Sequence, residues 1–197
     1  MQVTISASIT ESLKKSEIVP DVLDDFAAST LISISYAPDV EAVLGNTLEV
    51  AATQHYPKIT LALDGAAEPD TKYTIVMTDP DAPTRGDKKW SEYCHFVVSN
   101  LSFPPSASSP SGSEHVISQS DGTTLMEYFP PGPPPKTGKH RYVWIVYKQN
   151  NPSTPSAPKD RPCWGTGIPG YGVRDWAKEN NLTPTGVNFF YAQNVEQ

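Results

Sequence analysis

The chain has 197 residues, of which 38% are hydrophobic and 10% aromatic, and these values predict one soluble domain with a full core. Its formal net charge of −7 argues against general binding to nucleic acids or acidic membranes, although it leaves room for a local anion site. The sequence has neither an apolar run of the roughly 20 residues that span a bilayer nor a secretory signal pattern, so we expect a cytoplasmic protein.

Two short helical segments are predicted before the first strand. Ser8 and Glu11 have the spacing of a capping box, which predicts a helix over residues 9–16. Pro20 interrupts that helix, and a second turn or helix is expected over residues 21–26.

Alternating or continuous apolar runs, separated by turn signals, predict about eight strands. They are expected at residues 31–36, 59–63, 73–78, 94–98, 116–118, 124–129, 142–147 and 187–191. A late helix is expected at 173–180, and proline-rich composition predicts loops at 103–113, 130–138 and 150–162. The pattern therefore favours a mainly β protein of the sandwich or barrel class.

Two segments carry most of the chemistry. DPDAPTRGDKKWSEYCHF starts at Asp79, GPPPKTGKHRYVWIVY starts at Gly132, and each brings a histidine to the start of a strand, at His95 and His140. One such histidine is more often a structural residue, but two of them on proline-stiffened loops predict a small polar pocket at one end of a sheet. An anion is the ligand that this pocket suits best.

The aspartates Asp79 and Asp81 flank Pro80 where a buried strand is expected to end. Each of them can simply cap the turn. A carboxylate beside a histidine also fixes its tautomer and favours its charged form. The histidines would then donate hydrogen bonds to phosphate or carboxylate oxygens.

The two motifs resemble those of the phosphatidylethanolamine-binding protein family, also called the Raf kinase inhibitor protein family. DPDAPTR matches its first signature and GKHRYVWIVY its second. TDPDAPTRGDKKWSEYCHF, KDRPCWGTG, WAKENNL and NFFYA are similar to the fungal branch, the carboxypeptidase Y inhibitors. The resemblance covers nearly the whole chain.

The resemblance implies one domain over residues 1–197, with residues 1–28 as an N-terminal helical extension. It implies a β-sandwich of a large and a small antiparallel-rich sheet with a few short peripheral helices. It also implies a cis peptide bond between Ala82 and Pro83.

The resemblance implies an anion pocket that binds phosphate-bearing small molecules or phospholipid headgroups. Its implied ligand-binding residues are Asp79, Asp81, Pro83, Tyr93, His95, Gly132, Pro134, His140 and Tyr142. Two positions depart from the common pattern, because Cys94 stands where animal relatives often have histidine and Tyr93 where many have tryptophan.

Enzymes and metalloproteins are the main alternatives to a binding protein. The chain has no GxSxG motif, and neighbours on a strand such as Cys94 and His95 face opposite sides, so no catalytic residue is expected. Two histidines and an aspartate can form a metal site, but Asp79 more simply bonds a histidine, so we expect no metal and no cofactor. Cys94 and Cys163 lack CxxC spacing and are expected to be buried free thiols.

The favoured function is a non-enzymatic regulatory protein that inhibits a serine carboxypeptidase of the carboxypeptidase Y type. The inhibitory element is expected to be an N-terminal segment that projects from the domain and enters the protease cleft: Met1, Gln2, Val3, Thr4 and Ile5. The alternative is a scaffold that modulates kinase or small-GTPase signalling proteins. The expected location is the cytoplasm, with the vacuole or a membrane surface as alternatives.

Overall fold

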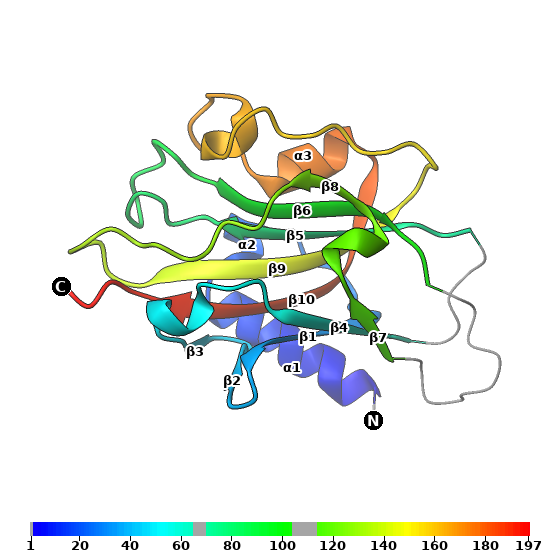
Figure 1. Ribbon diagram of the computed structural model, residues 1–197, viewed down its shortest axis with the longest axis horizontal. Coiled ribbons are helices and arrows are strands. Elements are labelled where there is room, and N and C mark those ends of the chain that lie inside the picture. The colour runs from blue at the N-terminus through cyan, green and yellow to red at the C-terminus, as the bar shows by residue number, and fades with distance from the viewer. Residues whose placement is uncertain (1, 65–69, 104–113) are drawn as a thin grey trace.

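Two β-sheets pack face to face in the computed structural model, which describes residues 2–64, 70–103 and 114–197 (Figure 1). The strands are β1 (Thr30–Ala37), β2 (Val40–Glu41), β3 (Asn46–Thr47), β4 (Lys58–Leu63), β5 (Tyr73–Asp79), β6 (Tyr93–Leu101), β7 (Glu114–Ile117), β8 (Thr123–Met126), β9 (His140–Gln149) and β10 (Leu182–Ala192). The smaller sheet has the order β2-β1-β4-β7 and the larger one β3-β10-β9-β5-β6-β8, which Figure 1 shows from bottom to top. All pairs are antiparallel except β3 with β10, so the predicted sandwich is confirmed.

Helices cover the outer face of the larger sheet. They are α1 (Gln2–Lys15), α2 (Ile18–Asp21) and α3 (Val173–Glu179), with short 3-10 turns at Val50–Thr53, Gln119–Asp121 and Pro162–Gly165. Successive side chains of a strand point to opposite faces, so β9 sends Trp144 into the core between the sheets and Ile145 into the core under the helices. The central strands are thus buried on both faces, which is why β5 and β9 read as continuous apolar runs.

The N-terminal helices differ from the prediction. Helix α1 begins at Gln2, so Ser8 lies inside the helix and not at its cap, and the first residues do not project as an extended segment. The second helix is α2 at Ile18–Asp21, which is earlier than the predicted residues 21–26. Burial of Ile9 and Leu13 against the larger sheet holds α1 in place. A capping pattern in the sequence does not report such a tertiary contact.

Each predicted strand is present, with boundaries that shift by up to a few residues. Strand β8 ends at Met126, three residues before the predicted end, and β10 begins at Leu182, five residues before the predicted start. The two-residue strands β2 and β3 were missed, because two residues carry no alternation. Loops are confirmed at 130–138 and over nearly all of 150–162, whereas most of 103–113 lies outside the described residues. No helix among the described residues is long and apolar enough to cross a membrane.

A buried arginine joins the N-terminal helices to the sandwich. Arg141 is 1% exposed, and its guanidinium donates through Nε and Nη2 to the two carboxylate oxygens of Asp81 at 2.9 and 2.8 Å. Its Nη1 donates to the carbonyl oxygens of Ser16 and Glu17 at 3.0 Å and lies 3.0 Å from the Asp21 carboxylate. A cation at the carbonyls that directly follow α1 also complements the helix dipole. One side chain therefore fixes the chain between α1 and α2 against the turn that follows β5.

We predict that Asp81→Asn lowers the free energy of unfolding by about 3–5 kcal/mol, because it leaves the buried Arg141 guanidinium without its main counterion. Urea denaturation of the variant measures this loss. Asp24→Asn is the matched control, since Asp24 forms an exposed ion pair with Arg174 at 2.9 Å and is expected to change stability by less than about 1 kcal/mol. Equal effects of the two substitutions would contradict the assignment.

Candidate functional site

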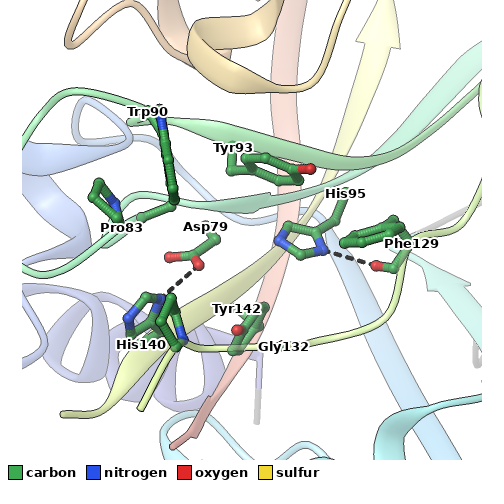
Figure 2. Close-up of a pocket in the computed structure, with 11 residues that line it drawn as sticks. Asp79, Pro83, Trp90, Tyr93, His95, Phe129, Gly132, His140 and Tyr142 are labelled. Atoms are coloured by element: carbon green, nitrogen blue, oxygen red, sulfur yellow. Dashed lines mark hydrogen bonds and ion pairs between the residues drawn. The ribbon is translucent and has the colours of Figure 1, made fainter. Parts of the chain in front are cut away.

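A pocket of about 160 Å³ lies at the end of the sandwich where β5 ends and β6 and β9 begin (Figure 2). This volume is roughly five times the share of one water molecule in the liquid, so a group the size of phosphate fits. It is lined by Asp79, Ala82, Pro83, Trp90, Tyr93, His95, Phe129, Gly132, Pro134, His140 and Tyr142. The structure therefore brings together every predicted ligand-binding residue except Asp81, while their role in binding stays a prediction.

A carboxylate–histidine pair forms one wall. His140 Nδ1 lies 2.8 Å from Asp79 Oδ2, and both side chains are at least 95% buried. The other ring nitrogen, Nε2, lies 3.0 Å from the hydroxyl of Thr137, which itself donates to the carbonyl of Pro134 at 2.7 Å. Both ring nitrogens of His140 thus have hydrogen-bond partners within the protein, and the contact with Asp79 fixes the orientation of the ring.

The prediction that Asp81 lines the pocket is wrong. Its side chain accepts from the backbone N–H of Arg141 at 2.9 Å and from the guanidinium of the same residue. The alternation along β9 explains this, because His140 and Arg141 are neighbours and face opposite sides of the sheet. Asp79 meets His140 on the pocket side, and Asp81 meets Arg141 on the helix side.

A β-bulge aims His95 into the pocket. Met77 of β5 pairs with Phe96 of β6, but the next residue, Thr78, pairs with Cys94, so the register skips His95. An extra residue in one strand redirects side chains at that point. Cys94 therefore packs in the core under the helices, whereas His95 lines the pocket. The expected separation of the Cys94 thiol and the His95 imidazole is confirmed.

The hydrogen bonds of His95 define its tautomer. Nδ1 lies 2.7 Å from the carbonyl oxygen of Phe129, which only accepts, so Nδ1 carries a hydrogen. Burial lowers the pKa of His95, and this effect outweighs the Asp79 carboxylate and the Phe129 carbonyl, which both raise it. Figure 2 shows the other ring nitrogen, Nε2, turned toward the Asp79 side of the pocket.

Aromatic rings form the remaining walls, and two of them were missed in the sequence. The ring centroids of Tyr93 and Tyr142 lie 5.0 and 5.3 Å from that of His95. Trp90 and Phe129 complete the rim and are 40% and 44% exposed. Trp90 lies within the first motif and Phe129 directly before the proline-rich loop, and that proximity was the available signal. The Ala82–Pro83 peptide bond at the rim is cis, as the resemblance implied.

A buried glutamic acid, Glu92, lies next to the pocket residue Tyr93 in the sequence and connects β5 with α3. Glu92 Oε2 accepts from the Thr78 hydroxyl at 2.9 Å and from the backbone N–H of Val173 at 3.2 Å, and Trp164 Nε1 donates to the same hydroxyl at 3.0 Å. Burial raises the pKa of Glu92 to about 7, although both hydrogen bonds and the charges of Lys88 and Arg174 lower it. Glu92 thereby connects the strand that carries Tyr93 with the start of α3.

This pKa predicts a pH-dependent stability. The folded protein binds the Glu92 proton more tightly than the unfolded chain, whose glutamate has a pKa near 4.5, so the contribution is full below pH 4.5 and disappears as the pH rises to about 7. We expect the unfolding free energy of the native protein to fall, relative to Glu92→Gln, by about 3 kcal/mol over this range. Chemical denaturation at a series of pH values measures the difference. The exposed variant Glu49→Gln serves as the control, and parallel curves for the native protein and Glu92→Gln would refute the prediction.

The cysteines and the candidate metal ligands are the side chains that could give the site other chemistry, and the two cysteines lie outside the pocket lining. Both cysteines are buried free thiols, as expected, and burial raises the pKa of Cys94 well above its ordinary value, which disfavours a reactive thiolate. The described residues contain no group of three or more histidine, cysteine, aspartate or glutamate side chains placed to hold a metal ion. The arrangement is instead that of a small site for a polar group.

Comparison with known proteins gives consistent similarities. The family model described as phosphatidylethanolamine-binding protein matches residues 38–192. The carboxypeptidase Y inhibitor of Saccharomyces cerevisiae is 38% identical over 205 residues, which cover 93% of this chain and 94% of that protein. An uncharacterized protein of the same yeast is 35% identical and covers 97% of this chain and 96% of its own. Among solved structures, the carboxypeptidase Y inhibitor complexed with its cognate proteinase superimposes with a TM-score of 0.88 at 36% identity over 96% of both chains.

Proposed function

This chain belongs to the phosphatidylethanolamine-binding protein family, and from that premise we propose that it inhibits a serine carboxypeptidase of the carboxypeptidase Y type and binds phosphate-bearing groups in its pocket. It acts by binding and not by catalysis. The observation that carries the proposal is the similarity to the yeast carboxypeptidase Y inhibitor, which extends over 93% of this chain. We propose a cytoplasmic location, with the vacuole or a membrane surface as the other compartments where it acts.

The first turns of α1 are suited to leave the helical state. They contain the β-branched residues Val3, Thr4 and Ile5, which are weak helix formers, and no acidic residue that would complement the helix dipole. Burial of Ile9 and Leu13 anchors the later turns. Unwinding before Ser8 therefore costs little, and it would supply an extended, uncharged segment to a carboxypeptidase cleft.

We expect a protein that starts at Ser8 to lose inhibition of carboxypeptidase Y while it keeps its fold. The truncation retains Ile9 and Leu13, and Ser8 with Glu11 can then cap the shortened helix. The inhibition constant and the thermal denaturation midpoint are the two measurements. Acetylation of the full-length terminal amine is expected to strengthen inhibition, because it removes a charge that is costly to bury. If the truncated protein inhibits as tightly as the full chain, the inhibitory surface lies on the sandwich.

The pocket part of the proposal is tested separately. His140→Ala removes the hydrogen-bond partner of the Asp79 carboxylate, which would then repel an anion in the pocket. We expect phosphate binding to weaken by about 1.5–3 kcal/mol, the range for a buried charged group that is left without its hydrogen-bond partner. A nuclear magnetic resonance titration with inorganic phosphate measures the change, and His55→Ala, which replaces an exposed histidine outside the pocket lining, is the control. Unchanged affinity in His140→Ala would exclude this pocket as the anion site.

A further inference from the structure

A short loop of residues 166–172, which we call the strap, connects the 3-10 turn at Pro162–Gly165 with α3 (Figure 1). Both of its ends are fixed, because the side chains of Trp164 and Val173 are buried in the core under the helices. Between these ends, residues 166–170 are all exposed. The strap can therefore move while the two side chains that anchor it stay in the core.

Backbone hydrogen bonds hold the strap to the start of β6. The N–H of Gly170 donates to the carbonyl oxygen of Ser91 at 2.9 Å. The N–H of Glu92 donates to the carbonyl oxygen of Tyr171 at 3.0 Å. Ser91 and Glu92 directly follow Trp90, which lines the pocket, so the position of the strap affects this part of the pocket rim.

The carboxyl group of Glu92 lies directly beneath the strap. Its Oε2 accepts from the N–H of Val173 at 3.2 Å, where the strap joins α3. The strap backbone packs so closely on the same group that a Cβ atom on Gly172 would lie 2.1 Å from Oε1. Glu92 is only 5% exposed. Movement of the strap, whose outer residues are exposed, is therefore a direct way for water to reach this carboxyl group.

No cation is paired with the Glu92 carboxyl group. None of the residues that the structure describes forms an ion pair with it, and Arg174 on α3 pairs with the exposed Asp24. A buried carboxylate without a counterion is costly, so burial favours the neutral acid and raises the pKa of Glu92. The charged and titratable groups that act on Glu92 or feel its charge are Lys88 before β6, Arg174 on α3, Cys94 on β6 and Tyr147 on β9.

We propose that Glu92 is a pH-sensitive latch for the strap: the strap lies closed on the neutral carboxyl group, and it opens to admit water when Glu92 loses its proton. In the closed state the carboxyl group accepts hydrogen bonds from Thr78 and Val173, whereas a carboxylate has about four positions to fill. Opening breaks the bond between Gly170 and Ser91 and so loosens the pocket rim at Trp90. The inference goes beyond the proposed function and depends neither on carboxypeptidase inhibition nor on anion binding.

The direction of the pH dependence follows from the two environments of Glu92. Under the open strap the carboxyl group is hydrated and has an ordinary pKa near 4.5, whereas under the closed strap its pKa is about 7. The ratio of open to closed strap is therefore lowest below pH 4.5, rises between pH 4.5 and about 7, and is constant above that. The full difference between the two pKa values would raise this ratio roughly 300-fold.

Amide hydrogen exchange of the full chain, followed by nuclear magnetic resonance between pH 4.5 and 7.5, measures the opening of the strap. In the native protein we expect the protection factors of the Gly170 and Val173 amides to fall by at least about tenfold over this range. Glu92→Gln keeps the shape of the neutral acid without its proton, so its protection factors are expected to stay constant within about threefold. Glu49→Gln, which replaces an exposed glutamate away from the strap, is the matched control and is expected to behave as the native protein.

A second variant tests the packing of the strap independently of the proton. Gly172→Ala places a Cβ atom where the closed strap meets Glu92 Oε1, so the strap cannot close in its native position. We expect the Gly170 amide of this variant to have low protection at every pH. Circular dichroism identifies a variant that fails to fold, and in that event the comparison of the native protein with Glu92→Gln decides.

Three results would overturn the inference. The first is a native protein whose strap amides keep constant protection, or lose it equally in Glu92→Gln. The second is exchange of the strap amides that accelerates in low urea as steeply as global unfolding, because the proton of Glu92 would then be linked to global unfolding and not to the strap. The third is full protection of the Gly170 amide in a folded Gly172→Ala variant, which would show that the strap closes without its contact to Glu92.

Discussion

The site and the N-terminal helices both depend on two pairs, each of an aspartate and a basic side chain, that lie back to back across β9. His140 and Arg141 are adjacent on this strand, and the two aspartates that flank Pro80 meet them on opposite faces of the sheet. Removing charged groups from water is costly unless they are paired and hydrogen-bonded, and here each carboxylate oxygen has a partner. The strand-end turn therefore has one arrangement in which all four side chains are satisfied.

Strand β9 thus connects two regions of the molecule, the pocket on one face and the N-terminal helices on the other. On the pocket side, Asp79 orients His140. On the helix side, Arg141 reaches the carbonyls at the end of α1. The helix is firmly held at that end, whereas its N-terminal turns have weak helical propensity. Under the proposed function, the N-terminal segment that enters the protease cleft is thus attached to a helix end that is firmly held.

The chemistry of the pocket is set by burial as much as by residue type. His95 is 97% buried among aromatic rings, and this environment favours its neutral form. Glu92 shows the same effect on the other side of the wall, where a carboxyl group without an ion-pair partner holds its proton up to about pH 7. For both groups, the ordinary pKa value would give a wrong expectation of how readily the side chain holds its proton.

The sequence by itself determined the class of fold and most of the pocket. The central strands have long apolar runs because they are buried on both faces, and the two motifs place His95 and His140 at strand starts. Only the tertiary structure decided which way the side chains face. The bulge that redirects His95 depends on the register between β5 and β6, and the removal of Asp81 from the pocket depends on the face that Arg141 occupies. Helix α1 begins six residues before the predicted capping box, so the local capping signal at Ser8 does not set its start. Alternation and capping are local patterns, whereas register and burial arise from segments that are distant in the chain.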